Sequence, residues 1–316
     1  MRTLRVTSGT GPDRVELAVR VHERDGLPES APTVLLVHGY PDTQAVWDRV
    51  VERLAAEHRV VTYDVRGAGD SSAPRRRAGY LIARLVDDLV AVLDAVQPSG
   101  DAAAPVHVVA HDWGSVALWD AVYLEEHDPR LRGRLHGRLA SYVSISGPSP
   151  DHVAAFVREA ARSGNHVELR QQRRKSWYVA AFHLPVLPEL VWTLLTPLLR
   201  VQLARVERLD SADWQPTLGR DGRRGLALYR ANLRPRLRSP AGPGTTRLPL
   251  TLVVPRYDRY VGRELIAAVR RANPHAVWVD LEAGHWVQRT HPDLLAGVVA
   301  QHVRRASGVD PEVTEE

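Results

Sequence analysis

An aspartate between small residues is the most informative feature of this chain. Residues 108–114 read Val-Val-Ala-His-Asp-Trp-Gly, so a β-branched run leads to Asp112, and a helical pattern follows it. This strand–turn–helix pattern, with Ala110 and Gly114 as the small neighbours, is typical of a nucleophile elbow, which projects one side chain above a sheet. A carboxylate there can attack an sp³ carbon and form an ester, whereas a serine would attack an acyl carbon. Capping of the following helix by Asp112 is the structural alternative, and the motif alone leaves both interpretations open.

Two further side chains follow predicted strands in the order that such a site requires. Asp258 comes just after an apolar run at 250–254, and His285 comes just after the run at 276–281. Both are expected at the carboxyl edge of the sheet, next to Asp112, and the order nucleophile, acid, histidine is typical of this arrangement. His285 is then predicted to be a general base whose tautomer Asp258 fixes. His291, in Thr-His-Pro, is interpreted instead as the residue that begins a helix.

The elements that would position these residues alternate along the chain. Short β-branched runs alternate with helical patterns, which predicts a mostly parallel sheet flanked by helices, an α/β fold. The strands are expected at Thr33–Val37, 60–63, 106–110, 142–145, 250–254 and 276–281, and the helices at 43–58, 80–96 and 115–123. Leu81, Leu85, Leu89 and Leu93 form one helical stripe. Residues 14–21 and the first few residues predict antiparallel edge strands.

One long segment breaks this alternation. Residues 148–244 show only helical patterns rich in Trp, Leu and Arg, and turn-forming Gly, Pro and Ser residues bracket them. We expect a core made of residues 1–147 and 245–316, with 148–244 forming a helical cap over the carboxyl edge, where open α/β sheets bind ligands. A long all-helical connection without a binding role is the alternative.

At this point the chain resembles the α/β-hydrolase superfamily, in particular its epoxide hydrolase branch, over nearly its whole length. The resemblance rests on His38-Gly39-Tyr40-Pro41, on the glycine-containing loop 64–71, and on the elbow, acid and histidine described above. It implies that the backbone amides of Tyr40 and Trp113 form an oxyanion hole, and that substrate contacts come from His38, Pro41, Trp177 and Trp286. The glycines of 64–71 also allow a dinucleotide-binding interpretation, but the first predicted βα turn lacks the G-x-G-x-x-G pattern, so a structural turn is favoured.

The resemblance also implies two tyrosines in the cap. Tyr178 precedes a proline at the spacing of the first cap signature, and Tyr229, in Leu-Tyr-Arg-Ala-Asn, matches the second. Tyrosine stays protonated at neutral pH, so it suits donation to an epoxide oxygen. Each tyrosine alone could be an ordinary packing aromatic. Together they favour hydrolysis of an epoxide to a vicinal diol through a hydroxyalkyl ester on Asp112, without a metal or organic cofactor.

Two other functions stay open. A haloalkane dehalogenase also has Asp followed by Trp at the elbow, and Trp192 could serve as a second cap tryptophan. A catalytically idle ligand-binding protein could reuse the same pocket. A fluoroacetate-type dehalogenase is disfavoured, because Trp113 stands where such enzymes usually have Arg.

Composition limits the partners. The chain has 316 residues with 44% hydrophobic and 25% charged content and no cysteine, which excludes disulfides and thiolate chemistry. The net charge is +5, but arginines alternate with acidic residues, so no nucleic-acid partner is expected. The longest apolar stretch, 184–199, contains Glu189 and three prolines and is too short to span a membrane. Because the start is polar, we expect a soluble cytoplasmic monomer or homodimer that acts on a small lipophilic epoxide.

Overall fold

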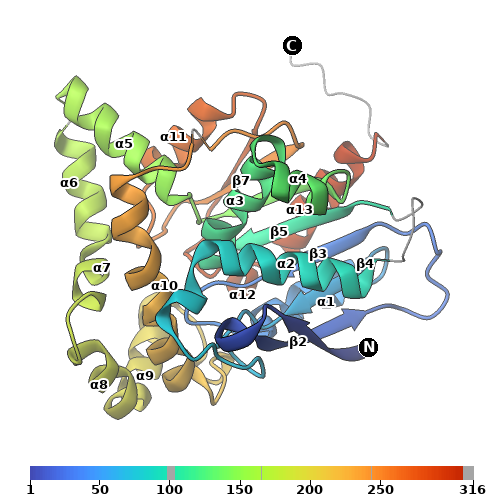
Figure 1. The fold of residues 1–316 in the computed structure, drawn as a ribbon, viewed down its shortest axis with the longest axis horizontal. Coiled ribbons are helices and arrows are strands. Elements are labelled where there is room, and N and C mark those ends of the chain that lie inside the picture. Colours follow the sequence, from blue (N-terminus) through green and yellow to red (C-terminus); the bar gives the residue numbers. More distant parts are fainter. Residues whose placement is uncertain (98–103, 165, 243, 309–316) are drawn as a thin grey trace.

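The computed structural model describes residues 1–97, 104–164, 166–242 and 244–308; the predicted core range 245–316 therefore ends in eight residues, 309–316, that lie outside the described part. In the described residues an eight-stranded sheet forms in the order β1-β2-β4-β3-β5-β6-β7-β8 (Figure 1). Its strands are β1 Arg2–Ser8, β2 Val15–His22, β3 Thr33–Val37, β4 Arg59–Tyr63, β5 Val106–His111, β6 Leu139–Ile145, β7 Leu250–Pro255 and β8 Val277–Leu281. Only β1 and β2 are antiparallel to their neighbours, so the predicted parallel sheet with two antiparallel edge strands is confirmed.

The strands form where β-branched and aliphatic residues follow one another. Every residue of β5 and β7 is buried, as expected for central parallel strands that helices cover on both faces. The register pairs Val37 with Ala110 and His111 with Ile145, so β3, β5 and β6 end at one level. The loops that leave these carboxyl ends consequently meet at one edge of the sheet.

Helices flank the sheet and fill the segment between β6 and β7. The α-helices are α1 Asp48–Leu54, α2 Ile82–Val96, α3 Trp113–His127, α4 Pro129–Leu135, α5 Pro150–Ser163, α6 His166–Lys175, α7 Trp177–Phe182, α8 Leu187–Leu194, α9 Thr196–Glu207, α10 Leu218–Arg238, α11 Arg263–Ala272, α12 Val287–Thr290 and α13 Pro292–Ala306. Short 3₁₀ turns lie at η1 Gly11–Asp13, η2 Gln44–Trp47, η3 Arg77–Tyr80 and η4 Ser211–Asp213. In the described residues no helix is both long and apolar enough to pass through a membrane.

Two predicted helices differ from the observed ones. The helix expected over 43–58 begins as the 3₁₀ turn η2, because the Thr43 hydroxyl accepts the Ala45 N–H and tightens the first turn. The helix expected over 80–96 begins only at Ile82, since η3 precedes it and Leu81 has extended backbone. Leu85, Leu89 and Leu93 are buried on α2 as predicted, but Leu81 stands outside the helix and is 40% exposed.

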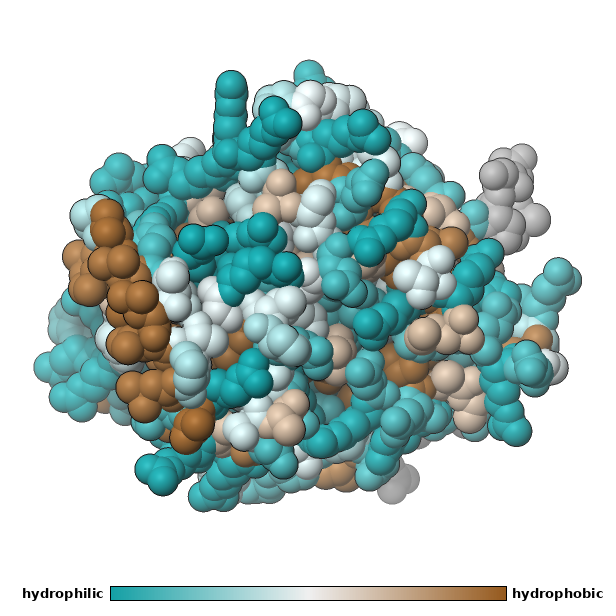
Figure 2. Space-filling view, turned by 90° about the horizontal axis from the view of Figure 1, so that it is seen from below, coloured by the Kyte–Doolittle hydropathy of each residue, from teal (hydrophilic) through white to brown (hydrophobic). Residues whose placement is uncertain are grey.

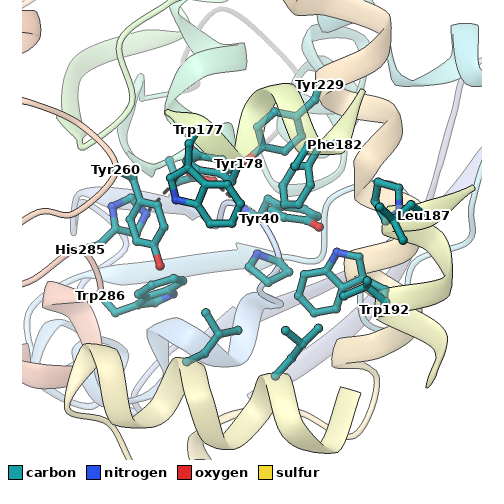
Figure 3. Close-up of a pocket in the computed structure, with 17 residues that line it drawn as sticks. Tyr40, Trp177, Tyr178, Phe182, Leu187, Trp192, Tyr229, Tyr260, His285 and Trp286 are labelled. Carbon is teal, nitrogen blue, oxygen red and sulfur yellow. Dashed lines mark hydrogen bonds and ion pairs between the residues drawn. The ribbon is translucent and has the colours of Figure 1, made fainter. Parts of the chain in front are cut away.

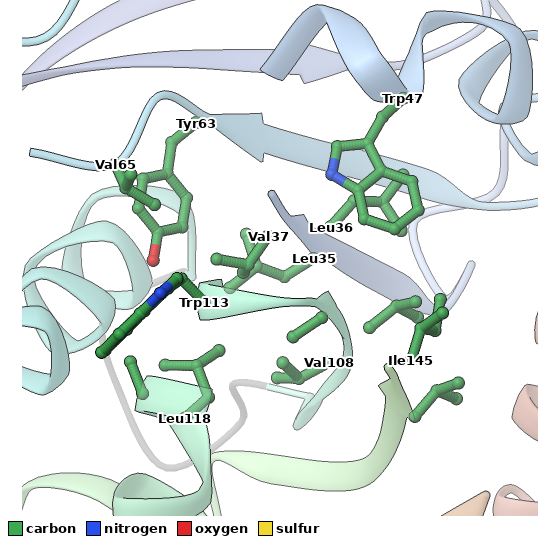
Figure 4. Close-up of a cluster of buried hydrophobic side chains, with 14 of the residues drawn as sticks. Leu35, Leu36, Val37, Trp47, Tyr63, Val65, Val108, Trp113, Leu118 and Ile145 are labelled. Carbon is green, nitrogen blue, oxygen red and sulfur yellow. The ribbon is translucent and has the colours of Figure 1, made fainter. Parts of the chain in front are cut away.

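Apolar side chains from both sides of the sheet form one core (Figure 4). Leu35, Leu36 and Val37 of β3 are essentially inaccessible to solvent, and Trp47 and Trp113 belong to the same buried cluster. Complete burial of an aliphatic side chain contributes about 1.5–3 kcal/mol. A buried ion pair adds to this core: Arg66 and Asp88 form a double hydrogen bond at 2.5 and 2.6 Å, which fixes the loop after β4 on α2.

Residues 148–244, called the cap segment below, contain α5 to α10 and no described strand. Its longest helix, α10, is attached to the rest of the chain at several points. The Asn232 side chain accepts the Ile82 N–H at 2.9 Å and donates to the Tyr80 carbonyl at 2.8 Å, and Arg236 pairs with Asp120 at 2.6 Å. Figure 1 shows α6, α7 and α8 on the side of α10 that is remote from the sheet.

Candidate active site

Asp112 stands on a sharp turn between β5 and α3. Its φ of 48° lies in the left-handed region, which Asp tolerates better than most residues. Its N–H donates to the Ile145 carbonyl at 3.0 Å, and its own carbonyl accepts the Val116 N–H at 2.8 Å to begin α3. The predicted strand–turn–helix at Asp112 is therefore present.

Glycines from three segments make room for this turn. A Cβ atom at Gly114 would lie 2.6 Å from the His38 carbonyl oxygen, which explains why the sequence has a small residue there. Gly39 and Gly147 have the same role from neighbouring strand ends: their Cβ atoms would lie 2.5 Å from the Asp112 Cβ and 2.4 Å from its carbonyl oxygen. The elbow thus depends on close backbone packing between distant parts of the chain.

The carboxylate of Asp112 faces backbone N–H groups. The Tyr40 N–H donates to Oδ1 at 2.8 Å, and the Trp113 amide lies near enough to this carboxylate to stabilise its charge. Burial raises the pKa of Asp112, and the positive charge on His285 and the two amides oppose that rise. The amides predicted as an oxyanion hole therefore lie at the carboxylate.

His285 links the two aspartates. Its Nδ1 lies 2.9 Å from Asp258 Oδ2, and its Nε2 lies 3.7 Å from Asp112 Oδ2. The amides of Tyr260 and Val261 donate to the other oxygen of Asp258, at 2.7 and 2.9 Å. Asp258 is thereby held so that it can orient the imidazole.

The electrostatic attraction between Asp258 and His285 decides their protonation states. Burial favours the neutral form of both groups, but their mutual attraction outweighs it. The pKa of Asp258 falls to about 2, because His285 and the donated N–H groups stabilise its charge. The pKa of His285 rises to about 9, because Asp258 and then Asp112 stabilise the imidazolium.

An apolar cavity of about 360 Å³ lies above Asp112 and His285, between the sheet edge and the cap segment (Figure 3). Tyr178 from α7 and Tyr229 from α10 line it, with ring centroids 6.0 Å apart. Burial and the nearby Asp112 carboxylate raise the pKa of both tyrosines, so both hydroxyls remain protonated at neutral pH. The remaining lining residues are Tyr40, Pro41, Trp177, Ala181, Phe182, Leu187, Pro188, Val191, Trp192, Leu199, Leu203, Tyr260 and Trp286.

The structure brings together nearly all the side chains that the sequence singled out. Pro41, Trp177 and Trp286, which we expect to contact substrate, line the cavity. The expected substrate contact of His38 needs correction, because its ring is fully buried beneath the turn and is absent from the cavity wall. Its Nδ1 donates to the Gly39 carbonyl at 2.8 Å and its Nε2 accepts the Val65 N–H at 2.9 Å, so His38 supports the turn that carries the Tyr40 amide.

Several residues at the site were not predicted. The ring centroid of Tyr260 lies 4.8 Å from that of His285 and 5.6 Å from that of Tyr178. The ring centroids of Phe182 and Tyr229 lie 5.0 Å apart. Tyr260 stands two residues after Asp258, so its position in that loop was an available signal. Glu207 of α9 is buried near His285, and burial raises its pKa. No motif in the sequence marks this glutamate.

The loop 64–71 folds around the carboxylate of its own first residue, Asp64. Asp64 accepts the backbone N–H groups of Gln44 and Asp70 at 2.7 and 2.8 Å. A Cβ atom at Gly69 would lie 2.3 Å from Asp64 Oδ2, so the glycine is needed for this turn. The structural interpretation of the loop accounts for its glycines without a bound nucleotide. Across the described ranges, no group of three or more His, Asp or Glu side chains is arranged to hold a metal ion.

This fold and this site define the class of protein. The chain belongs to the alpha/beta hydrolase fold family, whose profile matches residues 32–292. The fold predicted from the sequence is thereby confirmed.

Particular relatives place the chain within that family. It is 36% identical over 319 residues to "Probable oxidoreductase EphD" of Mycobacterium tuberculosis, a match that covers 95% of this chain and 50% of that protein. The chain thus spans about half the length of these relatives. It is also 36% identical over 160 residues to "Epoxide hydrolase" of Caballeronia sordidicola, covering 49% of this chain and 45% of that protein. The resemblance to epoxide hydrolases is confirmed.

Solved structures agree on the fold. A mutant epoxide hydrolase from Bacillus megaterium superposes with a TM-score of 0.72 at 18% identity, over 96% of this chain and 100% of that one. A mutant epoxide hydrolase from Solanum tuberosum gives 0.69 at 18% identity, over 96% and 100%. At such identity the likeness concerns the fold alone.

Proposed function

We propose that this chain hydrolyses epoxides to vicinal diols through an ester on Asp112. The observation that carries the proposal is that the elbow carboxylate lines the same apolar cavity as two tyrosines, each near enough for Asp112 to raise the pKa of its hydroxyl. A carboxylate is suited to attack the sp³ carbon of an epoxide. The tyrosines suit the alkoxide that leaves, because a strongly basic oxygen needs a weak acid beside it.

In the first step, an Asp112 oxygen forms a bond to one epoxide carbon and the C–O bond of the ring breaks. The ring oxygen takes a proton from Tyr178 or Tyr229, giving a hydroxyalkyl ester and a tyrosinate that is reprotonated from solvent. Aromatic walls exclude water from the carboxylate during this step. Without that exclusion, hydration would weaken Asp112 as a nucleophile.

In the second step, His285 removes a proton from water, and the resulting hydroxide adds to the ester carbonyl. The amides of Tyr40 and Trp113 stabilise the oxyanion. Its collapse breaks the ester C–O bond, His285 returns its proton to the leaving alkoxide to give the diol, and Asp112 loses its remaining proton to solvent and is restored as a carboxylate. Esterification itself prepares this step: it removes the negative charge of Asp112, which helps to keep the pKa of His285 near 9. The pKa then falls towards neutrality, and His285 becomes an available base.

The test separates these two steps. His285→Gln removes the base and should leave alkylation largely intact, so intact-protein mass spectrometry after addition of styrene oxide should show an adduct of the whole substrate mass. Digestion should place the adduct on the peptide that contains Asp112. The Asp112→Asn variant should give neither adduct nor diol. An adduct on another residue, or none in a His285 variant that binds substrate, contradicts the mechanism.

Substrate classes separate the alternatives. A haloalkane dehalogenase would release halide from 1-bromobutane, and an idle binding protein would turn over neither compound. Trp192 does line the cavity, but Tyr178 and Tyr229 favour an epoxide, since a halide needs only N–H donors. The oxidoreductase name belongs to relatives about twice as long as this chain. We therefore do not carry that activity over to this chain.

A further inference from the structure

The outer side of α8 and α9 carries an exposed apolar surface. Six residues, which we call the α8–α9 patch, have exposed fractions between 46% and 68%: Leu187, Leu190, Leu194, Leu195, Leu198 and Val201. On α8, Leu187, Leu190 and Leu194 follow helical spacing, and Leu198 and Val201 do so on α9, while Leu195 lies between the two helices. Figure 2 shows a continuous apolar band at the end of the molecule where Figure 1 shows α8. A band of this kind marks an interaction site more often than scattered single leucines do.

Polar groups within this surface have partners inside the protein. The carboxylate of Glu189 is neutralised by Arg230, with Oε2 3.0 Å from Nη2. The Thr193 hydroxyl donates to the Glu189 carbonyl at 2.7 Å, and the Thr196 hydroxyl donates to the Trp192 carbonyl. Moving this surface out of water therefore leaves few polar groups without a hydrogen-bond partner, which keeps the cost of desolvation low.

Basic residues lie on α6, at the same end of the molecule as the patch (Figure 1). Helix α6 carries exposed Arg170, Arg173 and Arg174 against a single acidic residue, Glu168. Within the described part of the chain these arginines form no ion pair, whereas arginines such as Arg236 and Arg263 are paired with aspartates. Figure 1 shows α6, α7 and α8 in a row along the same end of the molecule. A flat, negatively charged surface at that end would meet the arginines and the leucines together.

We propose that this end of the cap segment docks on the surface of an anionic lipid membrane. Apolar side chains inserted at the headgroup boundary and basic side chains over anionic headgroups are the two contributions that hold a peripheral protein there. A second copy of this chain is the alternative occupant, but a dimer formed through the leucines would give the arginines of α6 no role.

The docked end adjoins the cavity. Leu187 belongs to the patch and also lines the cavity, and Val191 and Leu199 on the same two helices line it from inside. A lipophilic substrate dissolved in the membrane would then have a short apolar path to Asp112. This path to the active site rests on the proposed function, whereas docking itself does not.

Vesicle co-sedimentation at low salt tests the docking, with phosphatidylcholine vesicles compared with vesicles that also contain phosphatidylglycerol. We expect the chain to sediment with the anionic vesicles. Leu194→Gln with Leu198→Gln should weaken this binding by ~30-fold, since two partly inserted leucines are lost while helix propensity is kept. Leu294→Gln, which changes a leucine 56% exposed on α13, is the matched control and should bind like the unchanged chain.

The same vesicle assay tests the contribution of the α6 arginines. Arg173→Gln with Arg174→Gln should weaken binding to anionic vesicles by ~10-fold, as expected for loss of two basic residues near the surface. Arg75→Gln with Arg76→Gln, in an exposed loop of the core, is the control. Absence of binding, or equal binding by the Leu194/Leu198 variant, overturns the proposal. So does a dimer, seen by sedimentation velocity, that the Leu194/Leu198 variant converts to monomer. None of these results depends on epoxide turnover.

Discussion

Replacing Asp112 by Asn tests whether its charge sets the protonation of His285. Nε2 of His285 lies 3.7 Å from Asp112 Oδ2, and the pKa of His285 is about 9. Two unit charges at that distance attract by about 4 kcal/mol at an effective dielectric of ~20, and about 1.4 kcal/mol corresponds to one pKa unit. Removal of the charge should therefore lower the pKa of His285 by about three units, to about 6. At pH 8 the imidazole would change from mostly protonated to mostly neutral.

Histidine ¹⁵N NMR titration of both proteins measures this change, with His285→Gln used to assign the signal. Asn is the appropriate replacement, because the φ of 48° at position 112 suits Asn better than Ala. Mass spectrometry must verify that the amide is intact during the titration. A pKa of His285 that stays near 9 in the Asn variant would refute the reasoning, since Asp258 alone would then account for the raised value.

Three further changes test the site and the core. Tyr178→Phe with Tyr229→Phe should nearly abolish epoxide turnover, with each hydroxyl contributing ~10²-fold in rate, and circular dichroism should show an unchanged fold. Arg66→Met leaves the Asp88 carboxylate buried without its partner, so denaturant titration should show a loss of about 3–5 kcal/mol in unfolding free energy; an unchanged midpoint would contradict this role for the pair. Gly147→Ala places a Cβ atom about 2.4 Å from the Asp112 carbonyl, so the melting temperature and turnover should both fall.

Much of the core was predictable because its signals are local. Strands such as Thr33–Val37 are continuous aliphatic runs, and Leu85, Leu89 and Leu93 repeat at helical spacing. The exact start of α1 was not predictable from that spacing, because one hydroxyl, on Thr43, decides how the first turn closes. Hydrophobic periodicity identifies an element more reliably than it identifies the element's ends.

The site residues likewise fall into those that local sequence signals predict and those that they do not. Asp112, Asp258 and His285 were identified by their places after strands, and the structure brings them together. Glu207 was missed because its burial beside His285 comes from the packing of the cap segment, which no short motif encodes. His38 was placed wrongly because a motif shows that a turn exists but does not show which way a ring within it points.

Tyr40 contacts both the sheet edge and the cap segment, the two parts of the chain that enclose the cavity. Its amide holds Asp112, while its hydroxyl donates to the Gly222 carbonyl of α10 at 2.9 Å, and a Cβ atom at Gly225 would lie 2.3 Å from its ring. If α10 swung outwards, it would pull on the same residue that aligns the carboxylate. Arg230 of α10 also donates to Glu189 of α8 and to the Phe182 carbonyl at the end of α7, so an outward movement of α7 and α8 would draw α10 with them. Mutations that remove the Arg230 contacts should therefore change how fast ligands enter and leave the cavity.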